Sequence, residues 1–440
     1  MATSNLVSAQ SQPERSATDY LIAAKQIEIQ NLAYFLQMGQ LVVMISDLVH
    51  ALQKERGASN IFLGSKGRHF EQSLSTLTQQ TDQQIQDFKH TLNQIHPELS
   101  QHCSSSRLLN RIAYVLHGLA GLLTARQKIR QLALATELST QLYSDIISGL
   151  LAIVFETADS AVDPTIARIL VAMFNLMHGK ELAGQERALG SAGFAAGQFS
   201  ATQIERLQYL IDAQERCFEL FREFAHSAAQ QLWQQQASQS YLIEIERLRR
   251  LILTQTQQHN RALPADQDDQ WFALLTQRID DLKSVETALE VHLQQLCEQK
   301  LSDAQTALGQ QQALIEQLQH DKHDNSDSFV VFLSSQDPQL KTAQHDHVHP
   351  DGLSPRLGRS VFELVQHQAH RLQQMQDELD AARQALEERK LQQKAKALLI
   401  KHRQMSEDEA HRLLRQMAMD QGKKLSDVAK TIIEMAQVWR

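Results

Sequence analysis

The sequence predicts an all-α protein, because its composition disfavours sheets and its apolar residues recur at helical spacing. Gly (16) and Pro (7) are scarce among 440 residues, and aromatic residues make up only 5%. The stripe of Leu41, Ile45, Leu48 and Leu52 marks one face of a helix. A chain of this length exceeds one ordinary core. We therefore predict a large helical-bundle domain over residues 20–320, a flexible linker over 321–360, a coiled-coil helix over 361–383 and a small three-helix domain over 384–440.

Turn-forming dipeptides divide the large domain into helices. Four of them interrupt the helical periodicity: Gly67-Arg68, His96-Pro97, Asp163-Pro164 and Leu263-Pro264. Each predicts a short polar connection between two helices, as expected for a bundle.

The segment 321–360 has the composition of a linker, with Ser, Asn, Asp, Gly and Pro in place of the helical pattern. Its histidines (His345, His347 and His349) could bind a metal, but a solvated linker accounts for them and no metal site is predicted. Beyond it, alternating spacings of three and four residues predict the seam of a short coiled coil, formed by Leu372, Met375, Leu379, Ala382 and Leu386. This seam could pair two chains in a homodimer or pack back on the large domain, and the sequence leaves both open.

Several protein classes are disfavoured by what the sequence lacks. Cys103, Cys217 and Cys297 are few and far apart, which argues against a disulfide framework or a structural zinc site. No signal peptide is visible, and the apolar run 146–155 is much shorter than the ~20 residues that cross a bilayer. No phosphate-binding loop, nucleophile elbow or HExxH motif occurs. We expect a cytoplasmic protein with no membrane partner, no catalytic residues, no enzymatic activity and no cofactor.

The C-terminal region differs from the rest in charge. Residues 381–440 hold 13 Lys and Arg against 8 Asp and Glu, although the whole chain carries a formal net charge of −8. An acidic body with a basic tail suggests that only the tail meets a polyanion. Within the tail, Gly422 is expected to end the second helix in a left-handed conformation, and Ser426 is expected to cap the third.

Short motifs follow one another in order through this basic tail. They are Ala385–Lys390, Lys394–Leu399, Met405–Ala410, Leu413–Ala418 and Lys424–Ala429. The series resembles the ANTAR domain, an RNA-binding module of transcription antitermination regulators, over about residues 384–438. Two positions depart from the usual pattern: Ala397 replaces a glycine, and His411 stands where an aromatic residue is common.

The ANTAR resemblance implies leader-RNA hairpins as a partner and, through them, an indirect effect on the transcription elongation complex. Lys and Arg side chains neutralise phosphates and release counterions, which supplies most of the non-specific affinity. The candidate RNA-binding residues are Arg389, Lys390, Lys394, Lys396, Lys401, Arg412, Arg415, Lys423 and Lys424. On charge alone, duplex DNA binding and a merely solvated bundle remain open.

Two segments of the large domain echo each other, Lys54–Gly64 and Gln185–Phe194. Each places Glu-Arg before a run of small residues and an aromatic residue, which predicts two related helical hairpins that face each other. Arg56 continues the stripe of Leu52 by one turn, so it is expected to point inward. The preceding glutamates point about 100° away around the helix and are poor partners for the arginines.

An inward-facing guanidinium needs an anion, because burying it unpaired costs several kcal/mol. One solution is a salt bridge with an Asp or Glu from another helix. The other is a small planar oxyanion, since the guanidinium fork donates two parallel hydrogen bonds. Small neighbours such as Gly57 and Gly184 leave room for only a small guest. Residue chemistry alone leaves both solutions open and favours the salt bridge.

The segments around Glu55-Arg56-Gly57 and Glu186-Arg187-Ala188, with Thr81-Asp82 and the helix of Arg247, resemble the NIT domain. That family is an all-helical receptor for nitrate and nitrite, and the resemblance covers about residues 20–320. It implies Arg56, Arg187 and Arg247 as ligand-binding residues, although Arg249 and Arg250 lie close to the third. With this resemblance, we expect Arg56 and Arg187 to lack a built-in carboxylate and to bind the anion. The histidines His50 and His117 are interpreted as packed core residues. Nitrate and nitrite are not distinguished.

Together these features predict a one-component switch for nitrate assimilation genes. The ligand is expected to free a masked RNA-binding domain, which then prevents a terminator hairpin from forming. A helical scaffold that binds RNA constitutively, without a ligand, is the alternative from a different class, and a DNA-binding regulator is the other.

Overall fold

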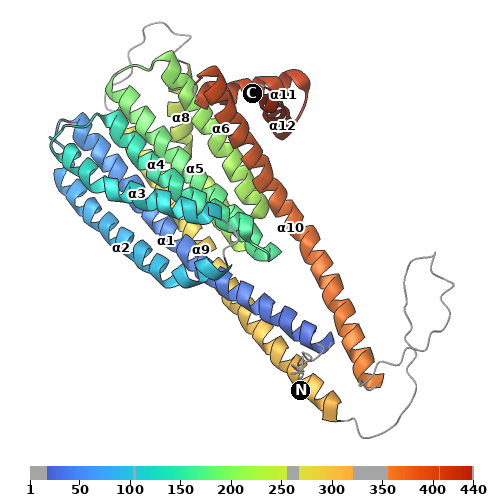
Figure 1. The fold of residues 1–440 in the computed structure, drawn as a ribbon. Coiled ribbons are helices and arrows are strands. Elements are labelled where there is room, and N and C mark those ends of the chain that lie inside the picture. The colour runs from blue at the N-terminus through green and yellow to red at the C-terminus, as the bar shows by residue number, and fades with distance from the viewer. Residues whose placement is uncertain (1–16, 103–105, 255–266, 321–354, 406, 439–440) are drawn as a thin grey trace, which may run out of the picture. The chain divides into compact units, whose positions relative to one another are not determined.

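The computed structural model describes residues 17–102, 106–254, 267–320, 355–405 and 407–438, and every regular element in these ranges is a helix (Figure 1). The elements in order are α1 (Ala17–Gly64), α2 (Glu71–His102), α3 (Ser106–Arg130), α4 (Thr136–Ser160), α5 (Pro164–Ala195), α6 (Ala201–Phe224), α7 (Ser227–Ala237), α8 (Tyr241–Leu253), α9 (Gln267–His320), α10 (Pro355–Arg403), α11 (Glu407–Gln421) and α12 (Leu425–Val438). The predicted all-α class is confirmed.

The chain forms two compact units. The first comprises Met1–Ala33 with Glu298–Met375, and the second comprises Tyr34–Cys297 with Gln376–Arg440. Three long helices, α1, α9 and α10, run through both units. Within the first unit, Leu21 and Leu32 of α1 and Ala304 of α9 are buried. The sites described below all lie in the second unit.

A first group of helices, α1 to α4, packs together in the second unit (Figure 1). The expected stripe on α1 is its core face, since Leu41, Ile45, Leu48 and Leu52 are all fully buried. The core of α4 is equally apolar and includes the fully buried Leu150. Removing such side chains from water is the main source of stability for a helical bundle.

A second group is formed by α5, α6, α8 and the part of α9 that belongs to the second unit. One apolar cluster joins all four helices through Phe194, Leu207, Leu248 and Trp271. The local start signals are clear: Asp163 accepts hydrogen bonds from the first amides of α5, and Ser200 forms a capping box with Gln203 before α6.

Two of the four predicted turns occur where expected. Gly67 adopts φ +80° in the connection after α1, and Asp163-Pro164 begins α5. The turn predicted at His96-Pro97 is wrong, because α2 continues through both residues. Leu263-Pro264 lies outside the described residues.

The C-terminal domain has a small core of its own. Ala395, Leu399, Leu414, Val428 and Ile432 from α10, α11 and α12 form one apolar cluster. Gly422 ends α11 with φ +59°, as predicted. The third helix begins at Leu425, two residues earlier than a cap at Ser426 requires, so Ser426 lies inside α12 and that prediction is wrong.

The linker and the coiled-coil helix differ from the prediction in their boundary. Helix α10 is continuous from Pro355 to Arg403, so residues 355–360 belong to the helix and not to the linker. Residues 321–354, with the three linker histidines, lie outside the described part of the chain. Leu379, Ala382 and Leu386 of the predicted seam are buried. Just beyond them, Arg389 lies over the ring of Phe174 on α5, so this part of α10 packs back on the large domain.

Three helices are longer and more apolar than the sequence analysis anticipated. By length and composition alone, α1, α3 and α4 could each cross a membrane. We compared how much of the 18-residue apolar stretch is buried in each helix. It is 61% in α1 and 56% in α4, but 28% in α3. The apolar residues of α1 and α4 are therefore explained by bundle packing.

Candidate anion site and basic surface

Two arginines from facing helices meet between the two helix groups. Arg56 of α1 is 1% exposed and Arg187 of α5 is 4% exposed, as the inward stripe predicts. Each guanidinium lies against a glycine of the other helix. A Cβ at Gly57 would lie 2.7 Å from Arg187 Nη2, and a Cβ at Gly184 would lie 2.6 Å from Arg56 Nη2. The small residues thus let each arginine cross to the opposite helix.

Arg56 has a carboxylate partner, which corrects the expectation that it lacks one. Its Nη1 donates to Glu181 Oε1 at 2.5 Å and its Nη2 donates to Glu181 Oε2 at 3.1 Å, while Nη1 also donates to Ser144 Oγ at 2.8 Å. Glu181 lies on α5, one and a half turns before Arg187, and was overlooked because nothing in its local sequence marks it. The interhelical salt bridge, the alternative left open by the sequence, is the arrangement at Arg56.

Arg187 is arranged differently. Its Nη1 donates to Thr276 Oγ1 at 2.8 Å, its Nη2 donates to the Gln53 carbonyl at 3.2 Å, and its guanidinium lies 4.7 Å from the centre of the Phe272 ring. In the described ranges, no carboxylate forms an ion pair with it. Burial and the neighbouring Arg56 lower the pKa of Arg187 to about 10, so it remains cationic at neutral pH.

The two preceding glutamates point away from the arginines, as expected, and brace the two helix groups. Glu55 accepts two hydrogen bonds from Arg126 of α3, at 2.7 and 2.8 Å, and Arg126 also donates to Asp82 of α2 at 2.6 Å. Tyr143 of α4 donates to Glu55 at 2.9 Å. One buried carboxylate therefore ties all four helices of the first group together.

The second group repeats this brace. Glu186 accepts two hydrogen bonds from Arg249 of α8, at 2.7 and 2.6 Å, and Arg249 also donates to Glu246 at 2.6 Å. Gln214 Nε2 of α6 also donates to Glu186, at 2.7 Å. The sequence echo therefore corresponds to two equivalent three-dimensional braces, each placing an arginine between the groups.

Arg247 is not brought to this site. It lies on the exposed face of α8 and pairs with Glu244 at 2.8 Å, three residues earlier in the same helix. The inward-facing arginine of α8 is Arg249, which is engaged by Glu186. The periodicity of α8 indicates this, because Ile245, Leu248 and Ile252 form its buried face and Arg249 follows Leu248 directly.

The histidines have different surroundings from each other. His50 is mostly buried, and burial together with nearby Lys180 lowers its pKa to about 2, so it is neutral. His117 is exposed, so its interpretation as a core residue is wrong.

A buried ion pair lies close to His50. Lys180 of α5 donates to Glu286 of α9 at 2.6 Å, and both are fully buried.

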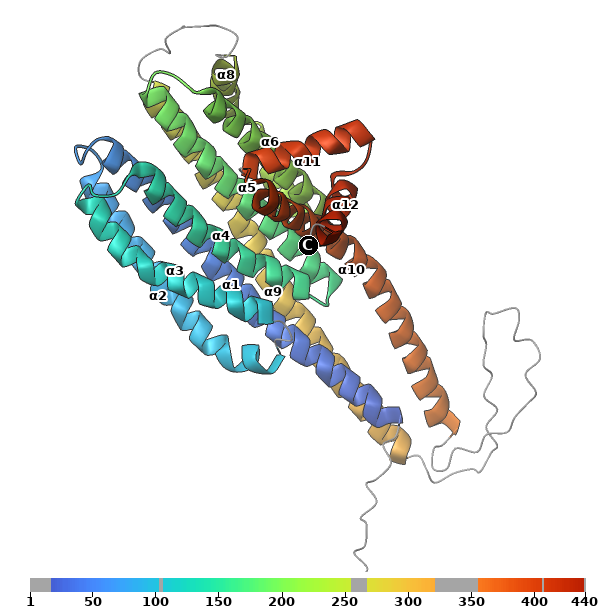
Figure 2. The same ribbon diagram turned by 45° about the horizontal axis from the view of Figure 1, so that its top comes forward.

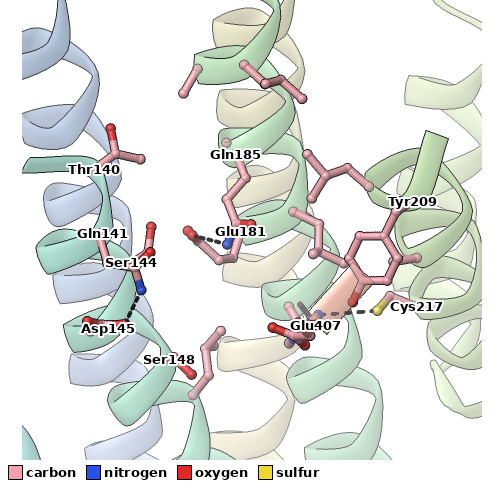
Figure 3. Close-up of a pocket in the computed structure, with 18 of the residues that line it drawn as sticks. Thr140, Gln141, Ser144, Asp145, Ser148, Glu181, Gln185, Tyr209, Cys217 and Glu407 are labelled. Carbon is pink, nitrogen blue, oxygen red and sulfur yellow. Dashed lines mark hydrogen bonds between the residues drawn. The ribbon is translucent and has the colours of Figure 1, made fainter. Parts of the chain in front are cut away.

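A cleft of about 2040 Å³ opens from the arginine pair. It runs between α4 and α5, where Ser144 and Ser148 of α4 face Glu181 and Gln185 of α5 (Figure 3). It continues to α10, where Arg389 lines it. Both arginines are therefore among the residues that line an open cleft.

The predicted RNA-binding residues fall into three sets. Four contact the large domain: Lys390 pairs with Asp159 at 2.6 Å, Arg412 with Glu205 at 2.5 Å, Arg415 with Asp212, and Arg389 donates to Asn175 at 3.3 Å. Lys396 pairs with Glu407 inside the C-terminal domain. The remaining residues, Lys394, Lys401, Lys423 and Lys424, are exposed.

His411, which departs from the usual ANTAR pattern, lies where α11 contacts α6. Its ring meets that of Tyr209 on α6 with centroids 5.0 Å apart, and one ring nitrogen lies 3.1 Å from Arg216 Nη2. Burial and Arg216 lower the pKa of His411 to about 4, so it is neutral here. Figure 2 shows α11 beside α6.

Comparisons with known proteins agree with both halves of this description. Residues 47–294 match the family described as nitrate and nitrite sensing (NIT), and residues 380–433 match the ANTAR domain. The chain is 36% identical over 425 residues to a nitrate regulatory protein of Klebsiella oxytoca, covering 96% of each. It is also similar to the solved structure of the NasR transcription antiterminator, with 35% identity, a TM-score of 0.58, and coverage of 96% of this chain and 99% of that one. The chain belongs to the family of nitrate- and nitrite-sensing regulators that carry a C-terminal ANTAR domain.

Proposed function

We propose that nitrate or nitrite binds between Arg56 and Arg187 in this nitrate-responsive transcription antitermination regulator. The observation that carries the proposal is the guanidinium of Arg187, which is buried, cationic and held only by a hydroxyl, a carbonyl and an aromatic face. None of these partners is anionic, and Asp280 and Glu181 attract the guanidinium only through space, without a direct ion pair. A buried guanidinium without a directly paired anion is costly in a protein interior. A planar anion with two oxygens matches the fork, and the glycines at 57 and 184 let the two guanidinium groups approach the opposite helices.

The RNA-binding surface is masked by acidic groups of the large domain. Three of its cations form ion pairs with carboxylates of the large domain. Lys390 pairs with Asp159 on α4, and Arg412 and Arg415 pair with Glu205 and Asp212 on α6. These carboxylates stand where phosphate oxygens of an RNA would, because phosphates and carboxylates make the same contacts with Lys and Arg. RNA and the large domain therefore compete for the same cations.

Helix α5 connects the anion site to the mask. It carries Arg187 and Glu181 at the site and, further toward its N-terminus, Phe174 and Asn175, which contact Arg389 of α10. A shift of α5 on anion binding changes the contacts that α5 makes with Arg389 of α10. The shift is limited by the difference in the anion's affinity for the masked and unmasked states.

Once released, the C-terminal domain binds leader-RNA hairpins and prevents a terminator hairpin from forming, which acts on the transcription elongation complex indirectly. The protein works in the cytoplasm and needs no cofactor besides its anion. Arg247 has no direct part in the anion site in this proposal, since it lies on the exposed face of α8.

The experiment that tests this function is RNA binding by the full chain with and without nitrate, using a hairpin RNA and a duplex DNA as competitors. A gain of about tenfold or more in hairpin affinity with nitrate is expected, with duplex DNA much weaker. Equal hairpin binding in both conditions would support a constitutive scaffold, and equal preference for DNA would support a DNA-binding regulator.

A further inference from the structure

Glu181 occupies the fork of Arg56 that a planar anion would use. Its two oxygens accept from Nη1 and Nη2 of Arg56, in the side-by-side geometry of a bidentate pair. Nitrate and carboxylate both present two oxygens to such a fork. With Glu181 in place, the Arg56 half of the anion site is already satisfied.

Glu181 also has other donors ready to hold it. Gln53 Nε2 of α1 donates to its Oε2 at 2.9 Å, and Gln185 Nε2 of α5 donates to its Oε1 at 3.0 Å (Figure 3). If Arg56 turns to another anion, the carboxylate keeps two amide donors. Its displacement therefore does not leave a buried charge without hydrogen bonds.

Only one of the two helices that share the repeat carries a carboxylate at this position. Glu181 lies six residues before Arg187, and the residue six before Arg56 is His50. His50 is neutral and forms no hydrogen bond to Arg187. Two guanidinium groups thus have one directly paired carboxylate between them, and Asp280 of α9 attracts Arg187 only through space. One guanidinium fork is therefore left for a monoanion.

Resting on the proposed nitrate function, we propose that Glu181 is a resident ligand of Arg56 that an incoming nitrate displaces, and that it restricts the site to singly charged anions. The carboxylate sets the nitrate concentration needed for the response, because every binding event must break its two bonds to Arg56. It also fixes the charge of the site, since a dianion would face an adjacent carboxylate.

The test is calorimetric titration of the full chain with nitrate and with sulfate, for the wild type, Glu181→Gln and His50→Glu. Glu181→Gln removes the competing charge and keeps one oxygen that can accept from a neighbouring amide, so nitrate is expected to bind about tenfold or more tightly, and sulfate binding is expected to appear. His50→Glu supplies the missing carboxylate at the position equivalent to Glu181, so nitrate is expected to bind about tenfold or more weakly.

Glu290→Gln is the matched control, because Glu290 is also buried and paired with a cation, yet it pairs with Lys283 of its own helix and does not line the cleft. Its nitrate affinity is expected to equal that of the wild type. Unchanged or weaker nitrate binding by folded Glu181→Gln would overturn the displacement. If that variant does not fold, His50→Glu decides, and wild-type affinity in it would overturn the inference. A wild-type chain that binds no nitrate would instead refute the proposed function itself.

Discussion

The guanidinium of Arg412 on α11 donates a 2.5 Å hydrogen bond to the carboxylate of Glu205 on α6, and one turn further along Arg415 pairs with Asp212. Glu205 and Asp212 are two turns apart on the same face of α6. A pair of acidic side chains on one helix thus holds a pair of basic side chains on another. This arrangement links the proposed RNA-binding surface to the large domain.

Removing the acidic pair should release the RNA-binding surface. Glu205→Gln with Asp212→Asn is expected to raise hairpin affinity in the absence of nitrate to near the nitrate-bound value, because the cations no longer have competing carboxylates. Gel shifts or fluorescence anisotropy at fixed salt measure this. Glu215→Gln, on the same helix, is the control. A double variant that still needs nitrate would show that these ion pairs do not mask the surface.

The exposed cations make a different prediction. Lys394→Gln and Lys401→Gln are expected to weaken RNA binding in both states and to reduce the slope of log affinity against log salt by about one per lost phosphate contact. The response to nitrate should persist, since in the described ranges no hydrogen bond or ion pair joins either side chain to the large domain. An unaltered salt slope would argue against phosphate contacts by these residues.

Arg56→Ala should abolish the nitrate response and also destabilise the protein. The variant leaves Glu181 buried with two amide donors and no cation, and breaking a buried ion pair from one side costs about 3–5 kcal/mol. Urea unfolding measures the loss. Arg56→Ala combined with Glu181→Ala should recover much of it. Wild-type stability of the single variant would mean that the Arg56–Glu181 pair contributes little.

The close approach of glycine and arginine gives a steric prediction. Gly57→Ala places a methyl group 2.7 Å from Arg187 Nη2, so the flexible end of that arginine must move out of position. Nitrate affinity is expected to fall by about tenfold, whereas the helix itself gains intrinsic propensity of roughly 1 kcal/mol. Gly64→Ala on the same helix meets nothing within 4 Å and serves as the control. Equal affinities in the two variants would contradict the packing of Arg187 against Gly57.

The brace in the second helix group predicts a pH dependence. Burial alone would raise the pKa of Glu186, but the Arg249 guanidinium outweighs it and lowers that pKa below 4.5. A lowered pKa stabilises the fold above the unfolded value and loses that contribution as pH falls through the folded value. Glu186→Gln is therefore expected to be less stable than the wild type at pH 7, by about 3 kcal/mol, with the difference shrinking below pH ~4. A difference that stays constant with pH would rule out ionised Glu186 as its source.

Part of this structure was predictable from local patterns. The stripe ending at Arg56 placed that arginine inside the bundle, and the left-handed Gly422 marked the end of α11. Helical periodicity is a property of neighbouring residues, so a single sequence contains it. The same holds for the direction of Glu55 and Glu186, which follows from their adjacency to the arginines.

The partners of the site arginines could not be predicted, because they depend on contacts between distant residues. Glu181 is far from Arg56 in sequence, and only the packing of α1 against α5 brings them together. Arg415 and Asp212 meet in the same way. The choice of Arg247 over Arg249 failed for another reason: the family resemblance outweighed the periodicity of α8, although the buried positions Ile245 and Leu248 point to Arg249.

The central claim is that the anion binds between the two arginines, and Arg187 tests it best because its removal breaks no ion pair in the described ranges. Calorimetric titration of nitrate into the full chain is expected to give one binding event for the wild type. Arg187→Ala should show no heat under the same conditions, with its helical content unchanged by circular dichroism. Nitrate binding by Arg187→Ala with wild-type affinity would contradict the account.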